Sequence, residues 1–479
     1  MINKFQLVTL IIIAAPILNI LLLKFFKKNL GVTTLFNKLI PITLLSITVM
    51  LLLNNVASEL IILTPLDRLS ISFDLNRNSL IFLIILDLFW LLFVIYLQKF
   101  LSLSSAKNSV YFLESFIYIV IALTLLAASS SLLSILIFYQ IVTILFYQYS
   151  NRFLHKKDDK SSLYFSAVIY AESLILMVAT IYAYQHFASL NIEYIGEHIG
   201  SLNKDQQLIF MLLLISPTLI FAIFPFSLFY RKINLNPLII FVLFFFLFFL
   251  SHSYLFIKFY FEIFKSINIS NFILTILEVI FLINILASST FLVFAKGLKS
   301  SFFYLFFQQL ILAIYSTILL LFFKNQFPIL PLISFAASFF IMVFCLSNIL
   351  LFLENSKKRK QHKIFGDLKI SIILLLIAIF NIASILPSIG LQVSFLVISK
   401  IIEEKLVISA VIYAISTFSV IIFFIKTIFP LLLKDDEHEQ FIQDEELAIK
   451  IDRNGYLIMP SIIFVLSIFA IPIIIYFTQ

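Results

Sequence analysis

Ionisable and amide side chains interrupt several long apolar stretches of this sequence. In chain order the candidates are Glu114, Gln140, Glu172, His252, Lys258, Glu278, Lys299 and Lys400. A charge at the centre of a bilayer costs about 3 kcal/mol even on lenient scales, so it is kept where it has a partner, water or a function. Acids and bases in such places can pass a proton through a helix bundle. We therefore expect an ion pathway among these residues.

A structural role is the alternative for each of these groups. Lysines near the ends of apolar stretches, which can extend to the membrane interface, are Lys258, Lys299 and Lys400. Asp87, Glu114 and Glu278 can be explained as hydrogen-bonded structural groups. His252 can be a polar contact between helices, or it can form a relay with Glu114 and Glu172.

The composition places these groups in a membrane protein. Of the 479 residues, 62% are hydrophobic and 12% are charged, against about 25% charged residues in soluble domains. The net charge of +8 is explained by basic cytoplasmic loops, so we expect the lipid bilayer and not nucleic acid as the partner. The single cysteine, Cys345, excludes an internal disulfide and a cysteine-based metal site.

Apolar stretches of about 20 residues predict an all-α polytopic fold with fourteen transmembrane helices. The expected spans are 5–23, 38–56, 79–98, 110–129, 131–150, 162–183, 207–230, 237–262, 270–293, 300–323, 328–353, 369–391, 406–430 and 457–478. Residues 391–400 are expected to extend the twelfth span as its broken second half. Most Lys and Arg residues fall in alternate loops, which predicts both termini on the non-cytoplasmic side of the inner (cytoplasmic) membrane.

Prolines predict broken helices in the seventh span, at Pro217 and Pro225, and in the twelfth, at Pro387. The separation of Pro225 from Pro387 nearly equals that between the starts of the fourth and ninth spans. This spacing predicts two inverted five-helix repeats, an arrangement typical of transporters.

The repeats divide the chain into four parts. These are three N-terminal spans (1–109), a first repeat (110–262), a second repeat (270–430), and an acidic cytoplasmic loop with the last span (431–479).

Five sequence segments carry a resemblance to one family. They are SISFDLNRNSLIFLIILDLFWLLFVIY (70–96), IFYQIVTILFYQYSNRFLHKK (137–157), AIFPFS (222–227), KGLKSSFFYLFFQQL (296–310) and LPSIGLQVS (386–394). In this order they resemble the antiporter-like membrane subunits shared by respiratory complex I and the multisubunit Mrp-type cation/proton antiporters, with the D-type antiporter subunit as the nearest resemblance. The resemblance covers nearly the whole chain and implies ion translocation through buried charges.

Several family charges are replaced in this chain. The positions concerned are Asn76, Gln140, Ile220, Ser251, Ala336, Phe340 and Ser394. By the resemblance, Gln140 stands where the family has a glutamate and Ile220 where it has a lysine. Losing both members of such a pair is less costly than leaving one charge buried and unpaired. The chain therefore keeps the family's pattern while conduction by the family's route is in doubt.

Three functions follow from this. The first is a membrane subunit of a multisubunit monovalent cation/proton antiporter, resembling the D-type subunit of Mrp antiporters. The second is a proton-translocating membrane subunit of NADH-quinone oxidoreductase (complex I), and the third is a non-conducting scaffold. Each of these implies other membrane subunits as partners, whereas a stand-alone solute carrier is a fourth alternative. With 7 glycines and no phosphate-binding or metal-ligand motif, we expect no cofactor, no metal and no catalytic centre in this chain.

Overall fold

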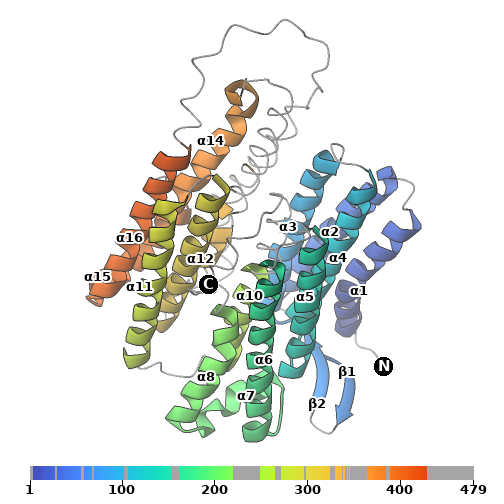
Figure 1. The fold of residues 1–479 in the computed structure, drawn as a ribbon. Coiled ribbons are helices and arrows are strands. Elements are labelled where there is room, and N and C mark those ends of the chain that lie inside the picture. Colours follow the sequence, from blue (N-terminus) through green and yellow to red (C-terminus); the bar gives the residue numbers. More distant parts are fainter. Residues whose placement is uncertain are drawn as a thin grey trace, which may run out of the picture. The chain divides into compact units, whose positions relative to one another are not determined.

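The computed structural model describes residues 4–26, 30–54, 59–66, 69–101, 106–153, 161–219, 249–264, 271–295, 298–323, 330–336, 338–339, 342, 345, 364–384 and 389–428. These residues form two compact units, which are described separately. The described part of unit 1 ends at Phe264, and that of unit 2 begins at Asn271. Helices dominate both units (Figure 1).

Unit 1 begins with three helices and a short hairpin. The helices are α1 (Lys4–Phe25), α2 (Leu30–Leu53) and α3 (Arg77–Leu101). Between α2 and α3, strands β1 (Glu59–Leu66) and β2 (Leu69–Asp74) pair antiparallel, with Glu59 opposite Asp74. The sequence-based prediction has a loop here instead of strands. The alternation of apolar and polar residues in Leu69–Asp74 is the strand signal that it misses.

The remaining helices of unit 1 build the bundle that holds the site. They are α4 (Ala106–Ala128), α5 (Leu132–Phe153), α6 (Ser161–Phe187), α7 (Ile192–His198), the 3-10 turn η1 (Ile199–Ser201), α8 (Lys204–Leu219), α10 (Ser251–Phe259) and the π-helical turn η5 (Tyr260–Phe264). Helix α6 packs between α5 and α8, and α10 packs against α8.

Serine side chains fasten one end of this bundle to the hairpin. Ser130 Oγ donates to Ser72 Oγ over 2.7 Å, and Ser131 Oγ donates to the backbone oxygen of Ser70 over 2.7 Å. The backbone of Ser130 also accepts from the amide of Ile192, the first residue of α7. The loop between α4 and α5 is therefore held on both sides, which fixes where α5 begins.

Unit 2 contains α11 (Asn271–Phe294), α12 (Leu298–Phe322), α14 (Ile364–Ile382), α15 (Ile389–Glu403), α16 (Val407–Phe423) and the π-helical turn η6 (Phe424–Ile428). Helix α12 contacts α11, α15 and α16, and most of its residues are buried. Phe302 of α12 stacks on Phe339, and the ring of Phe306 packs at a tilt against Phe335 and Phe339. These rings form the aromatic core of the unit.

The expected break in the twelfth span is present. Helix α14 ends at Ile382, Ser384 has a positive φ of 59°, and α15 begins at Ile389. As expected, the second half covers residues 391–400. Pro387 lies outside the described residues, as do Pro225 and the expected fourteenth span, 457–478. Pro217 lies inside α8.

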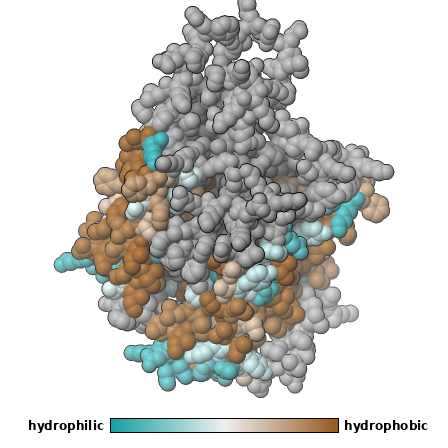
Figure 2. All heavy atoms as spheres, in the orientation of Figure 1, coloured by the Kyte–Doolittle hydropathy of each residue, from teal (hydrophilic) through white to brown (hydrophobic). Residues whose placement is uncertain are grey.

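Seven described helices are long and apolar enough to cross a membrane. Large hydrophobic side chains remain exposed along them, for example Leu174, Val178 and Ile181 on one face of α6. Figure 2 shows hydrophobic residues over the helices and hydrophilic ones gathered around α7 and the start of α8. Exposed apolar helix faces suit lipid as the solvent.

Candidate functional site

A buried acid lies near the middle of α6, where three helices of unit 1 meet. Glu172 is fully buried, and its Oε2 accepts a hydrogen bond of 2.9 Å from the hydroxyl of Tyr139 on α5. The same oxygen lies 3.2 Å from Nε2 of His252 on α10. That nitrogen is 3.0 Å from the Tyr139 hydroxyl, so the three groups close a triangle. We call Tyr139, Glu172 and His252 the acid–histidine cluster.

The cluster can hold a proton in more than one place. A carboxylate and an imidazole in contact share a proton that resides on either, and the phenol hydroxyl bridges them. On the far side of the imidazole, Nδ1 lies 2.9 Å from Oγ of Ser251. The second oxygen of Glu172, Oε1, is buried and has no hydrogen-bond partner among the described residues. A buried acceptor without a partner is costly, and this one is available to a proton or a water.

Gln140 lies one residue along α5 from this cluster. Its Nε2 donates to Oγ of Ser173, just as Tyr139 donates to Glu172 one position earlier on both helices. The amide is therefore bound between α5 and α6 as a neutral contact. Gln140, which the resemblance aligns with a family glutamate, thus lies next to a buried acid on the neighbouring helix.

A second buried charge lies further along α10. Lys258 is fully buried, and its Nζ donates to the hydroxyl of Tyr254 over 3.0 Å. Glu262, in η5, places Oε2 3.7 Å from this ammonium. Its Oε1 accepts from Nδ2 of Asn76 over 2.8 Å. The interpretation of Lys258 as a lysine that extends to the interface was wrong, because a carboxylate and a phenol hold it inside the bundle.

Sequence reasoning missed Glu262, Tyr139 and Tyr254. The spacing of Glu262 from Lys258, one helical turn, was the available signal for the pair. Glu262 lies in a π-helical turn, a feature that is frequent at functional sites. The backbone of α7 approaches this turn so closely that a Cβ on Gly196 would lie 2.0 Å from the carbonyl oxygen of Glu262.

Unit 2 has an acid of its own. Glu278 on α11 is 5% exposed, and its Oε1 accepts from the hydroxyls of Ser409 on α16 and Tyr315 on α12. At the break between α14 and α15, Ser394 bonds to Ser384 over 2.5 Å. Both sites are polar, but only the Glu278 site has an ionisable carboxyl, while the contact of Ser384 with Ser394 is neutral.

The other sequence candidates lie elsewhere. Glu114 is one turn before Tyr118 on α4, where its charge attracts Lys24 of α1, so the structure brings Glu172 and His252 together without it. Lys400 pairs with Glu403 in the last turn of α15. Lys299 lies in the first turn of α12, and its side chain is outside the described part.

The remaining positions singled out in the sequence belong to neither the acid–histidine cluster nor the site of Lys258. Asp87 is buried in α3, and Ala336 is buried beside the aromatic residues of unit 2. Ile220 and Phe340 lie outside the described residues. Within the part of the chain that the structure describes, no three His, Cys, Asp or Glu side chains are grouped as a metal site.

Comparison with known proteins supplies the context for this geometry. No protein-family model matches the sequence, and no curated protein matches it. Solved structures do. A chain of the membrane-bound sulfane sulfur reductase, an archaeal respiratory membrane complex, superposes with a TM-score of 0.76 at 13% identity, covering 98% of this chain and 96% of that one.

A chain of the Mrp complex from Dietzia sp. DQ12-45-1b superposes with a TM-score of 0.71 at 12% identity, again covering 98% of this chain and 96% of that one. Both similarities extend over nearly the whole chain. The protein is therefore a multi-pass membrane protein with the fold of these two membrane-complex chains.

Proposed function

We propose that this chain is a membrane subunit of a multisubunit monovalent cation/proton antiporter, resembling the D-type subunit of Mrp antiporters, and that its first unit moves protons through the acid–histidine cluster. The observation that carries the proposal is the contact of Glu172 with His252, 3.2 Å apart and almost without solvent exposure. An acid and a base buried together within a membrane bundle are a functional pair by default.

The cluster gives a physical route for a proton. A proton that arrives at Oε1 of Glu172 neutralises the carboxylate. Once the carboxyl has rotated so that the protonated oxygen takes the place of Oε2, it can protonate Nε2 of His252 directly. Alternatively, the Tyr139 hydroxyl gives its own proton to Nε2 and takes up that of the carboxyl. The imidazole can next release a proton from Nδ1 towards Ser251. Each step changes the charge of a group in a low-dielectric site, which neighbouring groups sense strongly.

The proposed route differs from the family's by small displacements. The acid is on α6 at Glu172 instead of on α5 at Gln140. The base is His252, next to the position of Ser251 where the family has a lysine. An acid and a base are thus retained at a similar depth of the bundle, although neither family position is charged.

A subunit of a respiratory membrane complex, as in complex I, is the second candidate. It is supported by the similarity in fold to a chain of the sulfane sulfur reductase complex. The two candidates use the same cluster and differ in the neighbouring subunits. A non-conducting scaffold is the third outcome that an experiment must distinguish.

The proposal includes a topology. Fourteen spans, both termini on the non-cytoplasmic side of the inner membrane, and inverted repeats at 110–262 and 270–430 remain predictions. They are supported by the agreement of span boundaries in both repeats, such as α5 (Leu132–Phe153) with 131–150 and α11 (Asn271–Phe294) with 270–293. Residues 1–109 and 431–479 flank the repeats.

The proposal is tested on the complex purified from its native membrane. Mass spectrometry of the co-purified subunits separates an antiporter from a respiratory assembly. After reconstitution into vesicles, Na⁺- or K⁺-dependent dissipation of a pH gradient is compared for the wild type and Glu172→Gln. We expect activity only with Glu172 present. Equal activity of both proteins would contradict the acid–histidine route, and no activity in the wild type would indicate the scaffold.

A further inference from the structure

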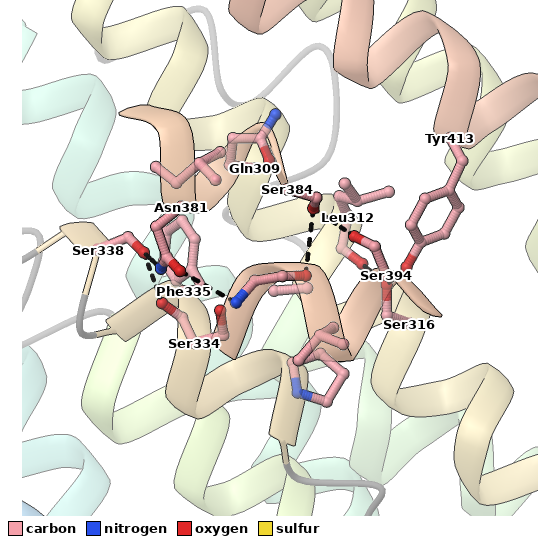
Figure 3. A pocket seen from close by; sticks show the side chains of 15 residues that line it. Gln309, Leu312, Ser316, Ser334, Phe335, Ser338, Asn381, Ser384, Ser394 and Tyr413 are labelled. Atoms are coloured by element: carbon pink, nitrogen blue, oxygen red, sulfur yellow. Dashed lines mark hydrogen bonds between the residues drawn. The ribbon is translucent and has the colours of Figure 1, made fainter. Parts of the chain in front are cut away.

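A polar cavity lies inside unit 2 at the break between α14 and α15 (Figure 3). Its volume is about 50 Å³, which is room for about three to five waters at the roughly 10–15 Å³ that each needs. Its polar lining carries no formal charge and consists of Gln309, Ser316, Ser334, Ser338, Asn381, Ser384, Ser394 and Tyr413. A cavity with this many polar partners is suited to hold water.

The helix break builds this cavity. Asn381, in the last turn of α14, accepts from the backbone amide of Gly390 through Oδ1 over 3.0 Å and donates to Ser338. Ser384 Oγ donates to the backbone oxygen of Gly390 over 3.1 Å. A Cβ on Gly390 would lie 1.8 Å from the carbonyl oxygen of Asn381, so only glycine allows the two helix ends to close around the space.

Of two neighbouring residues of α12, one contacts a buried acid and the other lines this cavity. Tyr315 bonds to Glu278 over 3.3 Å and to Ser409 over 2.5 Å. Ser316, next along the chain, bonds to the hydroxyl of Tyr413, and both line the cavity. Figure 3 shows Tyr413 directed from its helix towards Ser316.

Helix α16 has the same arrangement, with one residue at the acid and one at the cavity. Ser409 and Tyr413 are four residues apart and lie on one face of the helix, towards α11 and α12. Helix α16 thus presents one hydroxyl to Glu278 and the next to the cavity. Tyr315 and Tyr413 are the titratable groups described near Glu278 on the two helices that pack against α11. Lys426 bonds to the backbone of Val293 and Ala295, near the other end of α11.

We propose that Glu278 is a proton-exchanging site that communicates with water in this cavity through the hydroxyls of Ser409, Tyr315, Ser316 and Tyr413. The inference deepens the proposed function by giving unit 2 an acid of its own, separate from the cluster in unit 1. The ligand that Glu278 binds is a proton, which reaches it from water in the cavity.

The transfer is a balanced exchange of protons. The Glu278 carboxyl releases its proton to the oxygen of Ser409 or Tyr315, and that hydroxyl passes its own proton on. Water bridges the helical turn to the Ser316 and Tyr413 hydroxyls, and the last of these releases a proton to cavity water. Glu278 is left as a carboxylate with two hydroxyl donors, and the reverse sequence restores the acid. No electron or heavy-atom bond changes.

Infrared spectroscopy of the purified full-length chain tests the proposal without transport. The carbonyl stretch of a protonated buried carboxyl shifts when its proton is replaced by deuterium. Glu278→Gln assigns the Glu278 band, and Asp87→Asn assigns that of Asp87, a buried acid in unit 1. After a jump into D₂O, we expect Tyr413→Phe and Ser316→Ala to slow exchange of the Glu278 band about tenfold, equivalent to a barrier raised by about 1.4 kcal/mol. The Asp87 band should exchange at the wild-type rate.

Two results would overturn the proposal. One is the absence of a protonated Glu278 band throughout the accessible pH range. The other is exchange of Glu278 at the wild-type rate in both variants. Because the Asp87 band reports the integrity of each preparation and no transport is measured, these results are independent of the acid–histidine cluster.

Discussion

Glu172 and His252 lie 80 positions apart in sequence, yet Oε2 of the acid is 3.2 Å from Nε2 of the imidazole. The Tyr139 hydroxyl contacts both groups, at 2.9 Å and 3.0 Å. The cluster can therefore form only if α5, α6 and α10 are each held at one rotation about the helix axis. Because all three side chains are buried, changes at any one of them have consequences for stability as well as for proton movement.

Removal of the Glu172 carboxyl should destabilise unit 1. Glu172→Ala leaves the Tyr139 hydroxyl and His252 without their common acceptor, and a buried polar group without a partner costs about 1–3 kcal/mol. Glu172→Gln keeps one acceptor oxygen and should cost less. Thermal melting in detergent measures both variants, and equal melting of the alanine variant and the wild type would contradict the described contacts.

A charge at Gln140 should be unfavourable while Glu172 is present. The two positions are on facing turns of α5 and α6, so Gln140→Glu places a second carboxylate beside the first and removes the donor to Ser173. In combination with Glu172→Gln the repulsion is lost. A double-mutant cycle on melting free energies should show favourable coupling of about 0.5–3 kcal/mol. Additive effects would mean that the two side chains do not interact.

Gly390→Ala should destabilise unit 2. Its new Cβ would approach the backbone oxygen of Asn381 to 1.8 Å, and the backbone must move to relieve this contact. Overpacking of this kind costs about 1–3 kcal/mol. Gly200→Ala is the matched control, because nothing lies within 4 Å of a Cβ there. Similar melting temperatures of the two variants would argue against the close approach of the helix ends.

Removing only one charge of the Lys258–Glu262 pair should lower the free energy of unfolding. Glu262→Gln leaves a fully buried ammonium without its carboxylate, and we expect a loss of about 2 kcal/mol, below the value of about 3–5 kcal/mol for a completely buried pair. The double variant Lys258→Met with Glu262→Gln removes both charges and should recover part of that loss. A double variant less stable than Glu262→Gln alone would show that the ion pair is not the source of the effect.

Most helix positions could be predicted from the sequence, because runs of apolar residues directly report membrane-spanning length. The span predicted at 300–323 is α12 (Leu298–Phe322), and the break predicted from Pro387 falls between the end of α14 and the start of α15. The hairpin at Glu59–Asp74 was missed, since its strands are short and lie between two obvious spans.

The sites were only partly predictable. Glu172 and His252 stood out as polar residues in apolar stretches, but their pairing depends on helix rotation. Helices that are apolar on all sides do not encode that rotation. The burial of Lys258 was missed because nearness to a span end says nothing about which side of the helix faces the protein. Tyr139 and Tyr254 gave no signal among many aromatic residues.

The most direct test of the central claim is ion-dependent proton movement by the reconstituted native complex carrying Glu172→Gln, compared with the same substitution at the exposed Glu197 of α7. If Glu172 is the acid of the proton route, its variant should lose proton movement about 100-fold or more, since a group that transfers a proton typically contributes that much. Glu197→Gln should retain the wild-type rate. Wild-type rates in both variants, with the complex intact, would contradict the account.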